Sequence, residues 1–580
     1  PVAWTVAGSD SGGGAGIQAD LHAMRALGAH GCSIITALTA QNSVGVDAVE
    51  FCSEKMIRAS FKSLRNDLFP GAIKLGMMGT AEIVDVVVDE LKAVLEHAEK
   101  TGQTKPSIVC DPVMVATTGA VLMEAGTKEK MLQALFPLCN IVTPNKKEAE
   151  LLAGFKIRSP DDAEKAARMI LKDGKCDSIL LKGGHSSSSS SSSGGGADVG
   201  VDVVQDLLMH RNGESIWLTL PRVDSEHTHG TGCTLSSAIA AVLAGGQGTV
   251  PGSLHRLGPR NLNNDVASAC VLAKCYVHQG IRASSGIGKG AGPVAQTQWP
   301  TSPGSFPWVT STAKQGGDNR PGPFLPMEEA ASMEKGRRHA QGGGGGGGGR
   351  GEGNSAAAAA AAAAASDIQL LPVVSDAKWV GRLASIMKRE GISSCRHIQI
   401  RPKGLSREAL EEEIKRACDI ARESSSSSSS AGGGVKLWVN DHWDLAIKYG
   451  AYGVHVGQED LFRVDGKGCS TEVDLDKVKE AGLRIGVSTH TYEELAKGLA
   501  IRPSYISTGP VFHTNSKEIK YIPNGVAGIA SWRELIDPSI PLVAIGGISL
   551  ENARDCIEAG AVSLAVISAV TQQDDVAKAL

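Results

Sequence analysis

The feature that most restricts the fold is a regular alternation of short β-rich runs with helical patterns in the C-terminal part of this 580-residue chain. The runs are separated by amphipathic stretches such as SREALEEEIKRACDIARE, TYEELAKGLA and LENARDCIEAG. Strands that alternate with helices in this way pair in parallel, and eight such units close into a (β/α)8 TIM barrel. We expect its strands at residues 370–375, 396–401, 435–440, 452–456, 483–487, 504–508, 541–545 and 563–567.

The N-terminal part also alternates apolar strand candidates with helical patterns. Helices are expected near residues 16–29, 82–98 and 163–174. This order predicts an open, largely parallel sheet with helices on both faces, in which ligands bind outside the carboxyl ends of the strands. The strand candidates are residues 2–8, 31–38, 72–77, 107–114, 140–145 and 178–184.

Low-complexity tracts divide the chain, which is too long for one ordinary hydrophobic core. Serine and glycine runs at 186–196 and 424–434 resemble inserts in surface loops, because they bury too little apolar area to offset their ordering. Prolines, glycines and alanines at 296–365 are typical of a linker. We therefore predict domains at 1–295 and 366–580, joined by this linker.

Composition excludes several classes of partner. The net charge is −4 and the pI about 6.5, which argues against nucleic acid and anionic membrane surfaces. No apolar run approaches the roughly 18 residues that a membrane span needs. The 12 cysteines include no CxxC pair, so a reducing compartment fits better than a disulfide framework or a zinc site. The oligomeric state stays open, with a homo-oligomer among the options.

The stretch HTHGTGCTLSSAIAAVLAGG carries the clearest chemistry of the N-terminal part. Its loop, with Gly230 and Gly232, opens into an alanine-rich helix, whose free N–H groups suit a transferring phosphoryl group. Cys233 lies where the helix dipole lowers the pKa of a thiol, so it is placed to accept a proton from an attacking hydroxyl. The alternative is that Cys233 is a small buried hydrophobe beside a tight turn.

Barrel enzymes place their active sites at the carboxyl ends of the strands, so polar residues there are candidates for function. Cations, two carboxylates and two glycine or hydroxyl clusters follow the predicted strands. This combination suits a diphosphate–Mg²⁺ substrate and a second phosphate held after strands seven and eight. The residues are Gln399, Arg401, Lys403, Asn440, Asp441, Gln458, Asp460, Ser488, Thr514, Ser516, Lys517, Gly547 and Ser568.

The N-terminal part lacks a GxxxxGK[ST] motif and resembles the hydroxymethylpyrimidine/phosphomethylpyrimidine kinases of the ribokinase superfamily, which are αβα sandwiches. The resemblance rests on HGTGCT and on VAGSDSGGGAGIQADL, TAQN, KLGMMG, CDPVM, VTPNKKEAELL, LKGGH and GIGKGAGPV. It implies that Gly230, Gly232 and Cys233 are catalytic. It further implies aminopyrimidine contacts by Gly8, Asp20, Gln41 and Met77, and Mg–ATP binding by Asp111, Asn145, Glu148 and Lys182.

The C-terminal part resembles thiamin-phosphate synthase, through HIQIRPK, VNDHWDLA, VHVGQEDL, GVSTH, TGPVFHTNSK, AIGGI and AVISA. That family joins an aminopyrimidine diphosphate to a thiazole phosphate and releases pyrophosphate. The resemblance implies Mg²⁺ ligation by Asp441 and Asp460, with Arg401 and Lys517 as catalytic cations. It implies pyrimidine diphosphate contacts by Gln399, Lys403, Asn440 and Ser488, and thiazole phosphate contacts by Thr514, Ser516, Gly547, Ile567 and Ser568.

The two resemblances agree, because the product of one activity is the substrate of the other. The expected partners are therefore small molecules: the aminopyrimidine alcohol and its phosphates, ATP and thiazole phosphate. Two alternatives stay open, namely a pyridoxine- or pyridoxal-type kinase in the N-terminal part and a non-catalytic ligand-binding module in either part. Fused enzymes of this order resemble those of plants and algae, which implies the plastid stroma, with the cytoplasm as the alternative.

Overall fold

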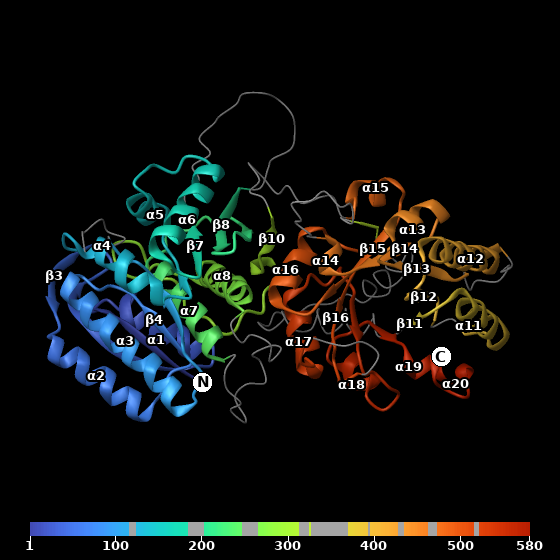
Figure 1. Cartoon of the computed structure of the whole chain (residues 1–580), viewed down its shortest axis with the longest axis horizontal. Helices are drawn as coiled ribbons and strands as arrows, with labels where there is room; N and C mark the ends of the chain where they lie inside the picture. The colour runs from blue at the N-terminus through green and yellow to red at the C-terminus, as the bar shows by residue number, and fades with distance from the viewer. Residues whose placement is uncertain are drawn as a thin grey trace, which may run out of the picture. The chain divides into compact units, whose positions relative to one another are not determined.

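The computed structural model describes residues 1–114, 123–183, 202–245, 265–311, 324–325, 369–392, 395–426, 434–461, 473–514 and 521–580. The chain divides into two compact units, Pro1–Asn319 and Arg320–Leu580, which are described separately. Both units contain the architecture that the sequence predicts, an open sheet in the first and a closed barrel in the second (Figure 1).

The first unit is built on a sheet with the order β10-β9-β8-β7-β6-β5-β4-β1-β2-β3. The centre of the sheet, from β2 to β7, is parallel, whereas β3, β8, β9 and β10 pair antiparallel at its two ends. The strands are β1 (Val2–Asp10), β2 (His30–Gln41), β3 (Val46–Phe51), β4 (Ala72–Leu75), β5 (Ser107–Cys110), β6 (Ile141–Val142), β7 (Ser178–Lys182), β8 (Val203–His210), β9 (Ser215–Pro221) and β10 (Trp308–Thr310).

Helices cover both faces of this sheet (Figure 1). Along β1, Trp4 and Val6 join the large apolar core that includes residues of α2, α3 and α6, whereas Thr5 bonds to Asp20 of α1. Successive side chains of a strand point to opposite faces of the sheet, so Trp4 and Val6 lie on one face and Thr5 on the other. The helices are α1 (Gly16–Ala26), α2 (Glu54–Asp67), α3 (Ala81–Thr101), α4 (Thr127–Lys130), η1 (Met131–Leu135), η2 (Phe136–Leu138), α5 (Lys146–Ala153), α6 (Pro160–Gly174), α7 (Thr231–Gly245), α8 (Val266–Ala283) and η3 (Pro303–Ser305).

Helix α7 is apolar on all sides and is buried along residues 234–244. It packs against α1, α8 and the central strands β1, β4 and β5. A helix that is apolar all round is stable only inside a protein, so its sequence fixes its place in the core. The glycine loop at its N-terminus is thereby held at the carboxyl edge of the parallel strands.

The second unit is a closed barrel of eight parallel strands in sequence order, β11 to β18. Each strand lies within two residues of the predicted range. They are β11 (Gln369–Val374), β12 (His397–Ile400), β13 (Lys436–Asn440), β14 (Gly453–Val456), β15 (Arg484–Thr489), β16 (Tyr505–Thr508), β17 (Leu542–Ile545) and β18 (Ser563–Val566). The interior is packed by a cluster that includes Leu371, Val373, Trp438, Tyr505 and Val543.

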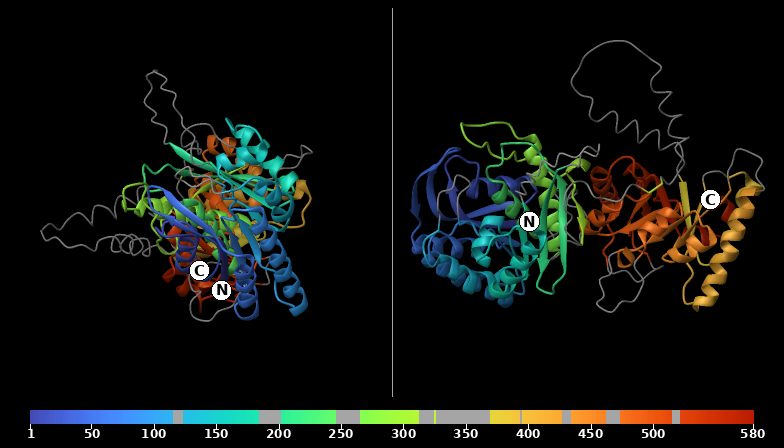
Figure 2. Two further views of the ribbon diagram at one scale, coloured as in Figure 1. Left: turned by 90° about the vertical axis from the view of Figure 1, so that its left-hand side faces the viewer. Right: turned by 90° about the horizontal axis from the view of Figure 1, so that it is seen from above.

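Helices follow the strands on the outside of the barrel, and α11 packs against α12 there (Figure 2). They are α11 (Ala377–Glu390), α12 (Arg407–Ser426), α13 (Trp443–Tyr449), α14 (Gln458–Leu461), α15 (Leu475–Glu480), α16 (Tyr492–Ala500), α17 (Gly525–Leu535), α18 (Ala553–Glu558), α19 (Ser568–Thr571) and α20 (Val576–Ala579). No helix among the described residues is both long and apolar enough to cross a bilayer.

The structure corrects two local predictions. The predicted linker starts at residue 296, but β10 pairs with β9, so the chain as far as Thr310 belongs to the sheet of the first unit. Helix α12 continues to Ser426, into the serine run that the sequence predicts as a loop insert. The first serine–glycine tract, the rest of the second and nearly all of 312–365 lie outside the described residues.

Candidate active sites

The first candidate site lies at the carboxyl edge of the parallel strands in the N-terminal unit. Asp111 follows β5 and Lys182 ends β7, and the Lys182 Nζ donates to Asp111 Oδ1 over 2.9 Å. Gly232 of α7 lies against this pair, because a Cβ on it would stand 3.2 Å from Lys182 Nζ and 3.4 Å from Asp111 Oδ2. Three residues predicted from separate motifs thus meet where ligands of such sheets bind.

Glu148 and Asn145 lie beside that ion pair and form a capping box at the start of α5. The Glu148 N–H donates to Asn145 Oδ1 over 3.0 Å, and the Asn145 N–H donates to Glu148 Oε2 over 2.8 Å. The pKa of Glu148 is raised to about 7, because burial and the Asp111 carboxylate outweigh the opposing Lys182 ammonium. A buried carboxyl with a raised pKa among other charges is a mark of a functional site.

The glycine loop before α7 rests on the glycine-rich loop after β1. Gly230 has φ +79°, and a Cβ on it would lie 1.8 Å from Gly14 O, so only glycine fits. Asp10 accepts the N–H groups of Gly12 and Ala15, each over 2.8 Å, and pairs with His229 at 3.4 Å. Sequence reasoning missed Asp10 and His229 as site residues, although both lie inside the quoted motifs.

Cys233 is the third residue of α7, at the helix N-terminus as predicted, but its pKa is not lowered. The pKa of this thiol is raised to about 11, because burial, Asp20 and Asp111 together outweigh the Lys74 ammonium. Burial of the thiol therefore outweighs the lowering of its pKa by Lys74 and by a backbone hydrogen bond from Gly16. The prediction that the pKa of Cys233 is lowered is therefore wrong. The prediction that Cys233 lies at the N-terminus of a helix is correct.

Asp20, predicted to contact the pyrimidine, is fully buried beneath the site. Its carboxylate accepts from Thr5 Oγ1 (2.6 Å), Lys74 Nζ (2.7 Å) and Ser237 Oγ (2.6 Å). Ser237 lies one turn after Cys233 on α7, so this network fastens the helix to β1 and β4. Lys74 was not singled out, because nothing in the sequence links it to a carboxylate 54 residues away.

The other predicted pyrimidine contacts lie at the ends of β1, β2 and β4. A Cβ on Gly8 would come within 3.1 Å of Met77 Sδ, so these two residues are neighbours. The Met77 carbonyl accepts from Thr36 Oγ1 of β2 over 2.6 Å. Gln41 ends β2, and its backbone is joined to Ser11 in the loop after β1.

The second candidate site lies at the carboxyl ends of the barrel strands. Gln399 of β12 donates to Asn440 Oδ1 of β13 over 2.7 Å, and both side chains are buried. Asp441 follows β13, and Asp460 lies in α14, near enough for Asp441 to influence the pKa of the Asp460 carboxyl. Burial raises the pKa of Asp460, although the Gly457 N–H and Asp441 oppose this. The two predicted Mg²⁺ ligands thus lie side by side.

Asp441 does not occupy the N-cap position of the helix that follows it. Helix α13 has His442 at that position, and the His442 side chain makes no capping hydrogen bond. Asp441 itself has φ +64°, a left-handed conformation that costs energy outside glycine. Such strain at a strand end is found where a side chain must be aimed, which fits a ligand-binding carboxylate.

Ser488 lies in β15 at the head of a buried polar chain. His455 Nε2 lies 2.8 Å from Ser488 Oγ, and His455 Nδ1 lies 2.7 Å from the Tyr505 hydroxyl. Sequence reasoning missed His455 and Tyr505, because a strand interior gives no sign of which polar residues face one another. Arg401 and Lys403 follow β12, half-buried and exposed respectively.

The predicted phosphate contacts of the barrel lie after β16, β17 and β18. Gly547 has φ +66°, and a Cβ there would stand 2.5 Å from His513 O, so the loop after β17 packs on the loop that holds Thr514. Ile567 and Ser568 begin α19 directly after β18. Ser516 and Lys517 lie outside the described residues.

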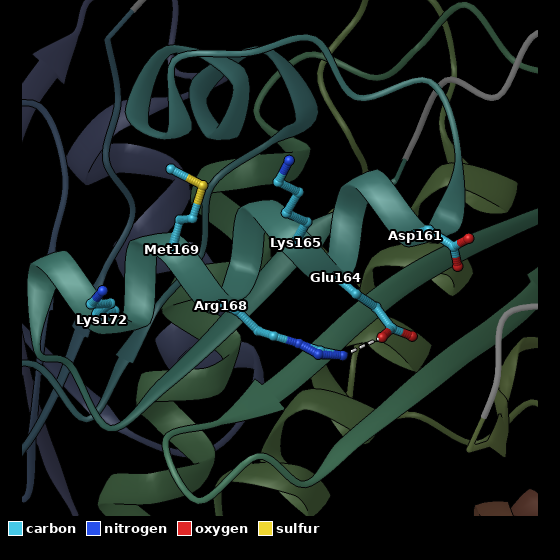
Figure 3. A pocket seen from close by; sticks show the side chains of 6 residues that line it. All are labelled: Asp161, Glu164, Lys165, Arg168, Met169 and Lys172. Atoms are coloured by element: carbon cyan, nitrogen blue, oxygen red, sulfur yellow. Dashed lines mark hydrogen bonds and ion pairs between the residues drawn. The ribbon is translucent and has the colours of Figure 1, made fainter.

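A surface hollow along α6 contains none of these residues (Figure 3). Its walls come from one helix, and Arg168 pairs there with Glu164 one turn away. Mixed charges on one exposed helix face are ordinary for a solvated surface.

Among the described residues, no three His, Cys, Asp or Glu side chains are arranged to hold a metal ion. Mg²⁺, however, is usually bound by one or two carboxylates together with substrate phosphates, which the Asp441–Asp460 pair suits.

A glycine loop at a helix N-terminus beside a lysine, and neighbouring carboxylates after two barrel strands, are typical of a two-domain enzyme that acts on phosphates. Residues 10–253 match the family described as phosphomethylpyrimidine kinase, and residues 371–570 match thiamine monophosphate synthase. The chain is 32% identical over 590 residues to thiamine biosynthetic bifunctional enzyme TH1, chloroplastic, of Arabidopsis thaliana, across 99% of this chain and 90% of that protein. It belongs to the family of bifunctional thiamine biosynthetic enzymes.

Two further relatives agree with this assignment. A probable thiamine biosynthetic bifunctional enzyme, chloroplastic, of Oryza sativa subsp. japonica is 30% identical across 99% of this chain and 87% of that protein. A hydroxymethylpyrimidine/phosphomethylpyrimidine kinase of Streptomyces coelicolor is 39% identical across 51% of this chain and 93% of that protein. The predictions of fold, family and bifunctional enzyme class are confirmed.

Proposed function

We propose that the N-terminal unit phosphorylates hydroxymethylpyrimidine and then its monophosphate, with ATP as the phosphoryl donor. The observation that carries this proposal is the meeting of Gly232 with the Lys182–Asp111 pair. It brings free N–H groups of α7 and an ammonium group to one point, and phosphoryl transfer depends mainly on such positioning and charge neutralisation. Bound Mg²⁺ would supply further neutralisation of the phosphates, held through Asp111 and Glu148.

The remaining kinase residues have separate roles in this proposal. Asn145 fixes Glu148 through the capping box. Gly8, Gln41 and Met77 border the aminopyrimidine at the ends of β1, β2 and β4. Cys233, at the start of α7, accepts the proton of the attacking hydroxyl in its thiolate form, which is the minor form at neutral pH because burial raises its pKa. Asp20 supports the site from below through Lys74 and Ser237, because its oxygens are occupied by protein partners.

In the C-terminal unit we propose coupling of the pyrimidine diphosphate to thiazole phosphate, with release of pyrophosphate. The Asp441–Asp460 pair carries this part, because it suits a hard cation that also binds a diphosphate. Bound Mg²⁺ would stabilise the departing pyrophosphate as a Lewis acid. Gln399 and Asn440 present an amide pair to the pyrimidine edge, and Ser488 bonds to the diphosphate.

The phosphate groups need cations and donors from several loops. Arg401, Lys403 and Lys517 would neutralise the diphosphate, so that charge in the transition state is met by preorganised groups. The thiazole phosphate would be held by residues after the last three strands, as barrels commonly do. These residues are Thr514, Ser516, Gly547, Ile567 and Ser568.

We also propose a plastid location, because both full-length plant relatives are named chloroplastic. The substrates in this account are all small molecules, and no step needs nucleic acid or a membrane. Fluorescence microscopy of whole plant or algal cells that express a fluorescent fusion of the protein would test the location, and a signal confined to the cytoplasm would contradict it.

The substrate of the kinase separates this proposal from a pyridoxal-type kinase. We expect the full chain to phosphorylate the pyrimidine alcohol with a kcat/KM at least about tenfold above that for pyridoxine or pyridoxal, a factor worth about 1.4 kcal/mol. ADP release with each alcohol measures this directly. A higher kcat/KM for pyridoxine or pyridoxal would indicate that the N-terminal unit is a pyridoxal-type kinase. Binding of the pyrimidine and pyridine alcohols without phosphorylation of either would indicate a ligand-binding module.

A further inference from the structure

A buried polar chain runs through the barrel interior towards the proposed diphosphate site. Tyr505 begins β16 and is fully buried, with its ring stacked on His455 at 5.6 Å between ring centres. The Tyr505 hydroxyl lies 2.7 Å from His455 Nδ1, and His455 Nε2 lies 2.8 Å from Ser488 Oγ. Ser488 Oγ in turn lies 3.3 Å from Ser507 Oγ, which is long for a bond between two hydroxyls.

The direction of these hydrogen bonds follows from burial. Burial raises the pKa of Tyr505 well above its ordinary value, so its hydroxyl keeps its hydrogen. Gly486 closes over the hydroxyl, since a Cβ there would stand 2.5 Å from its oxygen. In the described part of the chain its one hydrogen-bond partner is His455 Nδ1. If Nδ1 carried a proton, the phenol hydrogen would be buried without an acceptor, which is costly.

The neutral histidine therefore carries its proton on Nε2 and donates it to Ser488 Oγ. The hydrogen of Ser488 must then turn away from the ring. We propose that His455 and Tyr505 are positioning residues that fix Ser488 as a hydrogen-bond donor to the diphosphate leaving group. This inference rests on the proposed synthase function of the barrel.

A fixed Ser488 donor should affect the rate of the chemical step more than the affinity for the substrate. Negative charge grows on the diphosphate oxygens as the bond to the pyrimidine methylene breaks. A hydroxyl whose donor direction is already fixed gains interaction energy as that charge grows, without reorganisation. Loss of the arrangement should thus lower kcat more than it raises KM.

A double-mutant cycle in the full chain tests the proposal, with pyrimidine diphosphate, thiazole phosphate and Mg²⁺ supplied directly. Ser488→Ala should lower the synthase kcat about 10²-fold, as for loss of one donor to developing charge. Tyr505→Phe should lower kcat about tenfold. The double variant should be no slower than Ser488→Ala alone, because Tyr505 acts through Ser488. Losses that multiply would overturn the inference.

Controls separate this inference from the proposed function. Tyr492→Phe removes another buried tyrosine hydroxyl, in α16 against Trp532, and should leave both activities and the thermal midpoint unchanged. Circular dichroism and the thermal midpoint of the barrel, measured on each variant, check that it is folded, because the kinase unit has a core of its own. Normal turnover in Ser488→Ala would remove the proposed role of Ser488 and the inference with it. A slow Ser488→Ala beside a normal Tyr505→Phe would overturn the inference alone.

Replacement of the histidine gives a second discriminating result. The amide of Gln can place an N–H near the position of Nε2, whereas the shorter Asn places its amide near that of Nδ1. We expect His455→Gln to keep at least about tenfold more synthase turnover than His455→Asn, a difference near 1.4 kcal/mol in transition-state stabilisation. Equal or reversed rates in folded protein would contradict an Nε2 donor.

Discussion

Cys233 shows how opposing effects at one residue can be weighed. Burial and the carboxylates of Asp20 and Asp111 disfavour a thiolate and raise its pKa, whereas the Lys74 ammonium and a backbone hydrogen bond from Gly16 lower that pKa. The result is a pKa of about 11, so the thiol is protonated at neutral pH. The position of Cys233 was predictable from a glycine loop that opens a helix, but the sign of its pKa shift depends on burial and on charges from distant segments.

Replacement of Cys233 by Ala should lower kinase turnover about 10²-fold or more, the usual scale for a positioned base. Because its pKa is raised, the thiolate fraction of the wild type should grow about tenfold per pH unit, so log kcat/KM should rise with pH between 6 and 9. Cys233→Asp should lose that rise, since a carboxylate is already ionised. Cys275→Ala, at another buried cysteine, is the control. Near-normal turnover of folded Cys233→Ala would exclude the base role.

At the scale of elements, alternation of strand and helix was enough to place every barrel strand and the parallel centre of the sheet. The antiparallel strands β3, β8, β9 and β10 were missed. Three-residue β10 follows prolines and a glycine, so it lacks a period of its own, and it is a strand only because β9 offers an edge. Pairs such as Asp10–His229, 219 residues apart, likewise arise from topology and leave no local pattern.

The glycine loop gives a test at this scale with a matched control. Gly230→Ala should abolish most kinase activity, because φ +79° is unfavourable for alanine and the new Cβ would stand 1.8 Å from Gly14 O. Gly102→Ala has a similar φ, +68°, at the end of α3, with nothing within 4 Å of the Cβ. It should cost about 1 kcal/mol of stability and spare turnover. Equal kinase rates in the two variants would contradict the role of the loop contact.

The whole molecule consists of two units, and each candidate site draws its residues from one unit. Each unit has its own core, and the candidate residues of one site do not come from the other. A kinase and a synthase that share an intermediate need no shared catalytic residue, so we expect the two units to act as separate catalysts on one chain.

Fragments test that separation. We expect residues 1–311 and 366–580 to fold alone and to keep one activity each. The shorter fragment 1–295 should be less stable than 1–311, because it lacks β10, exposes the edge of β9 and loses the bond between His278 Nδ1 and Ser305 Oγ. Urea unfolding of the two N-terminal fragments measures the difference. Equal free energies of unfolding for fragments 1–295 and 1–311 would support a boundary of the N-terminal domain at residue 295.

The central claim is that one chain makes the pyrimidine diphosphate and then consumes it. The most direct measurement supplies the full chain with pyrimidine alcohol, ATP, Mg²⁺ and thiazole phosphate, and follows both the diphosphate and thiamin phosphate by chromatography. The wild type should form thiamin phosphate, whereas Asp441→Asn should stop there and accumulate pyrimidine diphosphate, because asparagine binds Mg²⁺ poorly. Thiamin phosphate formed at the wild-type rate by Asp441→Asn, or no diphosphate from either chain, would contradict the account.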